Sequence, residues 1–255
     1  MRKHNSNELI LYDEYEMNIK ERVIYSLVGV IGVFILCILF YNNHLIAGII
    51  SFVGLLYPRY KEKDLIKKRK QELIIQFKEA IYALSSSLAA GKSIESGFRA
   101  VLNDLKLLYA DNDTYIIREF EYIVRKIEMN ETIEEAISDF ANRAKIDDIS
   151  NFSDVLITAK RTGGNIISII RYTSNIICEK IEIKNEIEVS VANKQFEQKV
   201  LSLLVPLIII YLQISSPGYL DVMYSTIGGR ILMTIGLVLF VISYKIGKKI
   251  TDIEV

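Results

Sequence analysis

Residues Val23–Tyr41, VIYSLVGVIGVFILCILFY, form a run of 19 residues that carries no charge. A helix rises about 1.5 Å per residue and needs about 20 apolar residues to cross a hydrocarbon layer of ~30 Å, so this run predicts one membrane span. The polar turn Asn42–His44 follows, and Leu45–Tyr57 is again apolar up to Pro58. The two runs together predict a transmembrane hairpin over residues 23–58, in which the second run is short and therefore tilted or partly packed against its neighbour.

A second pair of uncharged runs lies near the other end of the chain. Val200–Leu220 and Ile231–Tyr244 contain no Asp, Glu, Lys or Arg. They predict a second transmembrane hairpin over residues 200–245, followed by a tail of residues 246–255. Arg230, at the start of the last run, is interpreted either as a charge that snorkels to the membrane surface or as a functional charge.

The distribution of basic residues predicts the orientation of these spans. Seven Lys or Arg residues lie in Arg59–Lys70, whereas the two turns, residues 42–44 and 215–229, contain none. The positive-inside rule then places the N-terminal segment 1–22, the middle of the chain and the C-terminus in the cytoplasm. We therefore expect a multi-pass protein of the cell (inner) membrane, whose basic cluster also contacts anionic lipid head groups.

The middle of the chain, residues 59–199, predicts a helical cytoplasmic domain. It contains no proline, and its apolar residues recur at spacings of three and four. With 23 basic and 23 acidic residues it is neutral, which argues against nucleic acid as a partner. The fold class predicted is all-α, a polytopic helical membrane protein with a cytoplasmic antiparallel helix bundle. The six expected helices are about 62–90, 93–109, 112–129, 132–145, 148–162 and 165–199, the last running into the third span.

Capping residues support these boundaries. Ser93 and Thr132 are expected N-caps, and Gly91 and Gly163 suit left-handed positions after helices. The order of residue types after Ser93 resembles the order after Thr132: a hydroxyl, an isoleucine and a glutamate. This likeness reflects either an internal repeat or the common requirements of a capped amphipathic helix.

No motif in the chain predicts catalysis, a cofactor or a metal. Gly91-Lys92-Ser93 resembles the end of a phosphate-binding loop, but Ser86 stands where that motif needs its first glycine, and the segment follows a helix. The two cysteines, Cys37 and Cys178, fall in different solvents and are expected to stay reduced and unpaired. The protein is therefore not expected to be an enzyme.

Two features point to structural or partner-binding roles. Lys160–Asn165 combines a basic helix end with a two-glycine break, where two helices can fold back tightly. Glu197 places a charge just before the third span, and Pro206 predicts a kink within it. The charged face of the last domain helix is interpreted as either solvated or docked to a partner. The candidate residues are Gly91, Gly163, Gly164, Arg161, Glu186, Glu197 and Pro206.

Two of these stretches resemble a known family. Phe77–Phe98, FKEAIYALSSSLAAGKSIESGF, looks like the opening of the type II secretion system F domain, and Ala159–Ile166, AKRTGGNI, is similar to its second signature. The resemblance covers about residues 73–245. A single such domain preceded by a membrane hairpin resembles the platform proteins of Tad (Flp pilus) machines.

The resemblance implies a function. Such proteins are inner-membrane platforms that couple a cytoplasmic hexameric ATPase to pilin assembly and bind no nucleotide themselves. The implied partners are that ATPase, a related platform protein, pilin subunits and membrane lipid, in a homo- or hetero-oligomer. The alternative is a membrane-anchored helical signalling or regulatory protein. The short external loops, of about three and fifteen residues, argue against a ligand receptor.

Overall fold

The computed structural model describes residues 10–15, 17–111, 113–162 and 166–251, and within those ranges every regular element is helical. The predicted all-α class is therefore confirmed. The described chain forms two compact units. One contains residues 10–15 together with Lys63–Ile183, and the other contains residues 17–62 together with the chain from Lys184 onward.

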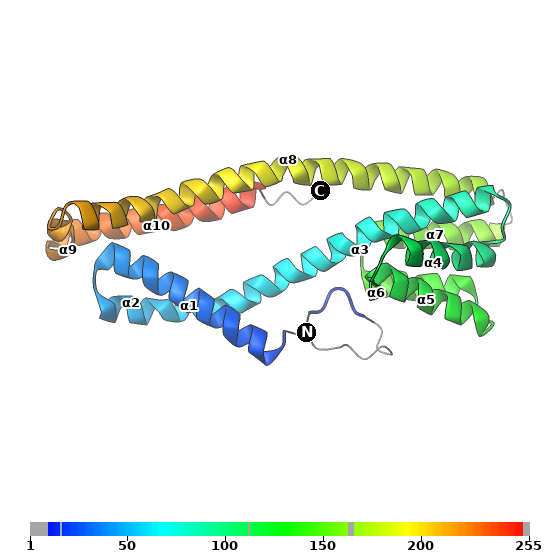
Figure 1. Cartoon of the computed structure of the whole chain (residues 1–255), viewed down its shortest axis with the longest axis horizontal. Helices are drawn as coiled ribbons and strands as arrows, with labels where there is room; N and C mark the ends of the chain where they lie inside the picture. The colour runs from blue at the N-terminus through cyan, green and yellow to red at the C-terminus, as the bar shows by residue number, and fades with distance from the viewer. Residues whose placement is uncertain (1–9, 16, 112, 163–165, 252–255) are drawn as a thin grey trace. The chain divides into compact units, whose positions relative to one another are not determined.

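The first unit is a bundle of consecutive helices. Figure 1 shows four short helices gathered against longer ones: α4 (Ile94–Leu108), α5 (Tyr115–Glu128), α6 (Ile133–Ala144) and α7 (Asp147–Thr162). The longer helices are the second half of α3 (Tyr57–Ala89) and the first part of α8 (Ile166–Ser215). These bounds agree with the six expected helices to within a few residues, and α8 continues into the apolar segment as expected.

Aromatic residues at helical spacing build the core of this unit. Phe77 of α3 packs against Phe140 of α6 at 6.1 Å and edge-on against Phe152 of α7 at 5.5 Å between ring centroids. Phe98 and Phe120 stack at 5.4 Å. Burying these rings supplies much of the hydrophobic stabilisation, because each aromatic side chain removes a large apolar area from water.

Side chains at the helix ends satisfy free backbone amides. The hydroxyl of Ser93 accepts a hydrogen bond from the Ser96 amide at 3.2 Å, and Thr132 accepts one from the Glu135 amide at 3.3 Å, so both expected N-caps are confirmed. Gly91 has a φ of +83°, in the left-handed region that glycine adopts at little cost. The amide of Ile116, in the first turn of α5, instead donates to buried Gln76 of α3 at 3.2 Å.

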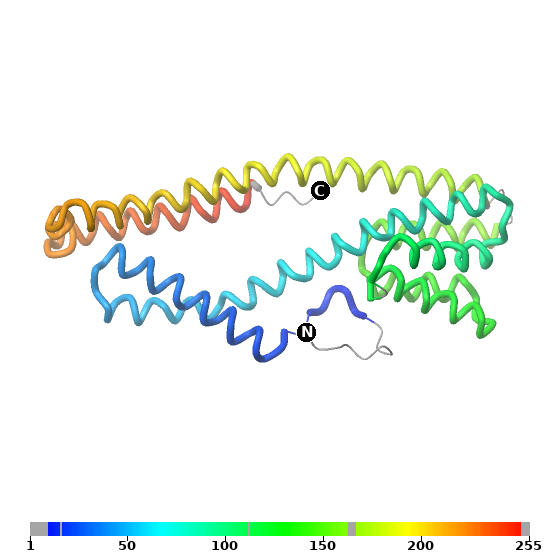
Figure 2. Tube along the Cα trace, in the orientation of Figure 1, coloured from blue at the N-terminus to red at the C-terminus, as the bar shows by residue number. Residues whose placement is uncertain are grey.

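The second unit consists largely of apolar helices. Helix α1 (Ile19–Tyr41) turns back through α2 (His44–Ser51) and the 3-10 helix η1 (Phe52–Leu56), as the tube in Figure 2 shows. The two limbs meet at glycines, because a Cβ on Gly29 would lie only 2.5 Å from the carbonyl oxygen of Gly54. Such small-residue contacts allow close helix packing where no water is present to drive association.

The last elements of this unit are the end of α8, the short α9 (Asp221–Ser225) and α10 (Ile227–Thr251). The side-chain amide nitrogen (Nε2) of Gln198 on α8 donates to the backbone carbonyl of Tyr244 on α10 at 3.1 Å, and this bond joins the two helices. Helix α8 continues unbroken through Pro206, and the predicted kink there stays a prediction.

Three of the four predicted spans are long and apolar enough to cross a membrane by length and composition. They lie in α1, α8 and α10. The remaining run, Leu45–Tyr57, is divided among α2, η1 and the start of α3, so whether it spans stays a prediction. Cys37 and Cys178 are both free thiols, and burial raises the pKa of Cys178 to about 11, which suppresses its reactivity.

Candidate functional site

Lys160, at the end of α7, joins the starts of two other helices. Its ammonium lies 2.8 Å from the carboxylate of Glu134 and 3.8 Å from that of Glu95. Glu95 and Glu134 stand in the first turns of α4 and α6, and each follows its capping hydroxyl by two residues. We call Lys160, Glu95 and Glu134 the Lys160 cluster. Each of the two similar segments has its own hydroxyl N-cap and a first-turn glutamate near Lys160, and whether they form an internal repeat stays a prediction.

Charges in the Lys160 cluster also complement the helix ends. Acidic groups at helix starts and a basic group at a helix end are each favoured by the helix dipole. Burial opposes ionisation of Glu134, but the hydrogen bond and charge of Lys160 outweigh it and lower the pKa of that carboxyl. Arg161, the next residue, is exposed. Gly163 and Gly164, predicted to belong here, lie outside the described residues.

A second ionic group is buried at the other end of α6. Both terminal nitrogens of Arg143 donate to the Glu119 carboxylate, at 2.8 and 2.6 Å. The hydroxyl of Tyr12 donates to the same carboxylate at 2.9 Å. We call these three residues the Arg143 cluster; their side chains are almost wholly buried, at 0% exposed for Tyr12, 2% for Glu119 and 7% for Arg143.

Burial and mutual pairing perturb the groups of the Arg143 cluster. Burial, followed by the adjacent Glu119 charge, raises the pKa of the Tyr12 phenol. Desolvation disfavours the charged form of Arg143, but its hydrogen bonds to the carboxylates of Glu119 and Asp139, and their negative charges, outweigh desolvation and raise its pKa, so the guanidinium stays charged. A buried pair with all of its groups hydrogen-bonded is stable, whereas removing one partner strands a charge.

The Arg143 cluster was missed by reasoning from sequence. Glu119 lies among apolar residues of α5, and Tyr12 was assigned to a polar segment preceding the first span. The available signal was the apolar run Leu9–Tyr12 within that otherwise largely polar segment.

The other candidate residues are not brought together. Glu197 pairs with Lys194 at 3.0 Å on the surface of α8, and Glu186 is exposed on the same helix. Further up α8, Glu182 pairs with Lys78 of α3 at 2.8 Å, so part of the charged face is paired within the unit. The role of Glu186, Glu197 and Pro206 stays a prediction.

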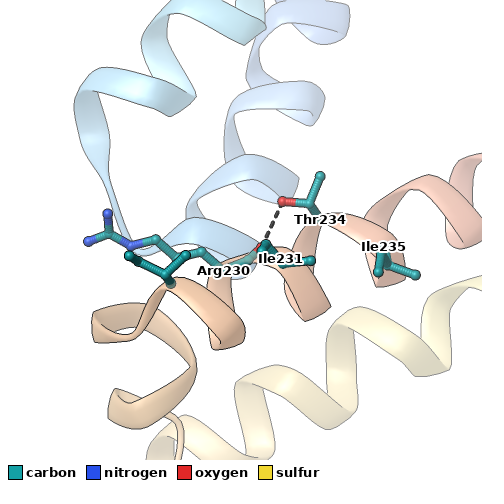
Figure 3. Close-up of a pocket in the computed structure, with 5 residues that line it drawn as sticks. Arg230, Ile231, Thr234 and Ile235 are labelled. Carbon is teal, nitrogen blue, oxygen red and sulfur yellow. Dashed lines mark hydrogen bonds between the residues drawn. The ribbon is translucent and has the colours of Figure 1, made fainter.

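The second unit contains an open pocket of about 390 Å³ at the start of α10 (Figure 3). Isoleucines and Thr234 line it, and Arg230 is the charged residue at its edge. The guanidinium points away from Thr234 and Ile235, and its Nε donates to the carbonyl of Tyr224 at 2.8 Å. An apolar wall with one cation at the end of a span resembles a snorkelling position more closely than a reaction site.

The fold and these clusters define a helical membrane protein whose compact bundle runs into apolar helices through α3 and α8. A family model described as type II secretion system (T2SS), protein F, matches residues 80–214. Because this match covers more than half of the 255 residues, the chain belongs to that family. Both signature stretches overlap the match, whereas α10 lies beyond it.

No curated protein and no solved structure matches the chain. Membership of this family makes the chain an inner-membrane platform protein of secretion and pilus systems. Proteins of the family are structural components of the membrane platform and not enzymes.

Proposed function

We propose that the chain is the platform of a Tad/Flp-like pilus machine and couples a cytoplasmic ATPase to pilin assembly. The observation that carries this proposal is the unbroken course of α3 and α8. Helix α3 begins at Tyr57, directly after the apolar run that ends in η1, and ends in the family's helical domain, whereas α8 begins in that domain and continues into an apolar segment. A continuous helix passes displacement along its axis, because each turn is hydrogen-bonded to the next.

The described N-terminal residues support the proposed topology. Residues 10–15 belong to the same compact unit as Lys63–Ile183, although the whole of α1 lies between them in sequence. This supports a topology in which both segments lie on one side of the membrane. If α1 crosses the bilayer, the chain must return before Lys63, which makes the run from His44 to Leu56 the returning limb.

The length of this returning limb is informative. Eight α-helical residues and five 3-10 residues extend about 22 Å at 1.5 and 2.0 Å per residue. That is shorter than a hydrocarbon layer of ~30 Å, so the first turn of α3 completes the crossing or the bilayer thins locally. Basic residues follow at Arg59 and Lys61, which favours the cytoplasmic side for the helical domain.

The Lys160 cluster is the proposed docking face for the ATPase. It joins the ends of three helices, and Lys92 and Arg161, which adjoin those ends in the sequence, are exposed. Charged rims of this kind steer association and set specificity. Pilin subunits and a related platform protein would then contact the apolar helices.

Charge reversal tests this face. The double variant Lys160→Glu/Arg161→Glu, in the full chain, is expected to lower co-purification of the ATPase at least about tenfold, since like charges across an interface cost several kcal/mol. Lys106→Glu is the matched control, because Lys106 is also a half-exposed, ion-paired lysine on the same unit, pairing with Glu121 at 2.6 Å. Unchanged co-purification by the double variant, with the control also unchanged, would refute this docking face.

A further inference from the structure

The segment before the first apolar helix is bound to the helical domain as a peptide ligand would be. We call residues 10–15 the tail segment. Tyr12 is its anchor: the ring is fully buried, meets Tyr115 edge-on at 5.7 Å, and its hydroxyl reaches Glu119. The backbone is held as well, because the Tyr12 amide donates to the Arg143 carbonyl at 3.1 Å.

Charged contacts flank this anchor on its C-terminal side. Asp13 forms an ion pair with Lys145. Arg69 donates to the carbonyl of Glu14 at 3.2 Å, and its guanidinium lies 4.8 Å from the centre of the Tyr15 ring. The domain therefore contacts an apolar residue, a tyrosine two positions later and the aspartate that follows it, together with the backbone of Glu14.

The tail segment also completes the burial of an ion pair. Arg143 donates to the Ile10 carbonyl at 3.4 Å, in addition to its bonds with Glu119. Without the segment, the Glu119 carboxylate and the Arg143 guanidinium would each lose one partner. A buried charge retains its favourable state only when its hydrogen bonds are satisfied, so the segment and the Arg143 cluster stabilise one another.

Connectivity gives this docking a mechanical consequence. Three residues separate Tyr15 from Ile19, the first residue of α1. At about 3.6 Å per residue, so short a linker keeps the start of α1 within roughly 15 Å of Tyr15. After α1, the chain passes through α2 and η1 directly into α3, which enters the helical domain as a continuous helix.

We propose that the helical domain contains a binding site for a Tyr-acidic peptide, and that its ligand is the chain's own tail segment. Docking clamps the start of α1 to the domain, so that both ends of the first apolar hairpin are attached to it. Resting on the proposed function, this clamp carries motion of the domain to α1 during assembly. The segment stays docked while the platform operates.

Hydrogen exchange on the full chain in membranes tests the docking itself. Tyr12→Ala removes the anchor and is expected to speed exchange of the 10–15 amides at least about tenfold, because local opening then needs less free energy. Leu11→Ala is the matched control, since Leu11 is 47% exposed in the same segment, and should leave exchange nearly unchanged. Equal protection in Tyr12→Ala and wild type would overturn the binding site, whatever the protein's partners.

A cross-link tests whether the clamp stays closed. Asp13→Cys and Lys145→Cys, in a chain lacking Cys37 and Cys178, are joined by a short thiol-to-thiol reagent. The locked protein is expected to assemble pilin as the unlocked one does, whereas Tyr12→Ala reduces assembly while ATPase association persists. Loss of assembly on locking, with Tyr12→Ala unimpaired, would overturn the clamp in favour of a segment that must release. Loss of ATPase association in wild type would instead count against the proposed function alone.

Discussion

The two ends of α6 carry two ionic clusters of opposite character. The carboxylate of Glu134 and the guanidinium of Arg143 belong to residues nine positions apart, about 14 Å along the helix at 1.5 Å per residue. The Lys160 cluster is partly solvated, with about 30% of the Lys160 and Glu134 side chains exposed. The Arg143 cluster is almost wholly buried and includes Tyr12, which precedes the first apolar helix in the sequence.

The difference indicates that the buried Arg143 cluster holds the fold together, whereas the partly exposed Lys160 cluster presents a surface. A half-exposed pair gains little free energy, because water competes for both charges, so it is free to exchange its partner for another protein. A buried pair tolerates no loss of a partner, and is therefore suited to fixing one segment in one place. Variants in the Arg143 cluster should therefore lower the free energy of unfolding more than variants in the Lys160 cluster.

The largest effect is expected from Arg143→Met. It leaves the Glu119 carboxylate buried without its cation, which costs about 3–5 kcal/mol of unfolding free energy. Thermal unfolding of the full chain in detergent, followed by circular dichroism, measures it. The triple variant Tyr12→Phe/Glu119→Leu/Arg143→Met removes every member of the group and should recover most of that loss, since apolar replacements of buried pairs are often neutral. A triple variant as unstable as Arg143→Met would contradict this account.

A smaller loss is expected from Tyr12→Phe. It keeps the buried ring but removes one hydrogen bond to a charged group, worth about 1.5–3 kcal/mol. Tyr82→Phe is its control, because Tyr82 is 62% exposed and its change should fall within about 0.5 kcal/mol. The same thermal measurement applies; equal melting temperatures for the two variants would show that the Tyr12 hydroxyl contributes nothing.

Removing the capping hydroxyl of Ser93 or Thr132 should lower the free energy of unfolding by less than Tyr12→Phe does. Ser93→Ala and Thr132→Ala each leave a helix-start amide without its acceptor, at a cost of about 1 kcal/mol. Ser86→Ala is the comparison, since Ser86 is exposed in the interior of α3, where alanine is the better helix former. A cap variant no less stable than Ser86→Ala would disprove the capping role.

The smallest stability change is expected from Glu134→Gln, at about 0–1 kcal/mol. Because the pKa of Glu134 is lowered in the folded protein, its contribution is present above the ordinary value near 4.5 and is lost as the pH falls through the lowered value. Melting temperatures of wild type and Glu134→Gln should therefore differ slightly at pH 7 and converge towards pH 3. A melting-temperature difference between the two proteins that grows as the pH falls would contradict the lowered pKa of Glu134.

Sequence patterns predicted the helices well and the long-range polar contacts poorly. Leu73, Phe77 and Leu84 lie at spacings of four and seven residues, which indicates one helix face, and all three are fully buried. The three-residue spacing of Leu105 and Leu108 predicts one buried face, but Leu108, the last residue of α4, is 60% exposed whereas Leu105 is 1% exposed. Propensity says nothing about which helix lies opposite.

The candidate sites divide in the same way. Lys160 and the two capped helix starts were visible as separate motifs, but their convergence required the bundle. Glu119 looked like an ordinary charge on an amphipathic helix, and its burial depends on Arg143, 24 residues away, and on Tyr12, 107 residues away.

By itself the sequence determined the helical class, the apolar segments and the family signature, because these depend on local periodicity and on the cost of placing charges in lipid. Only the tertiary structure decided that residues 10–15 belong to the helical domain and that one arginine and one glutamate pair in its interior. Those outcomes depend on contacts between residues far apart in the chain, whose free energy no local window of sequence contains.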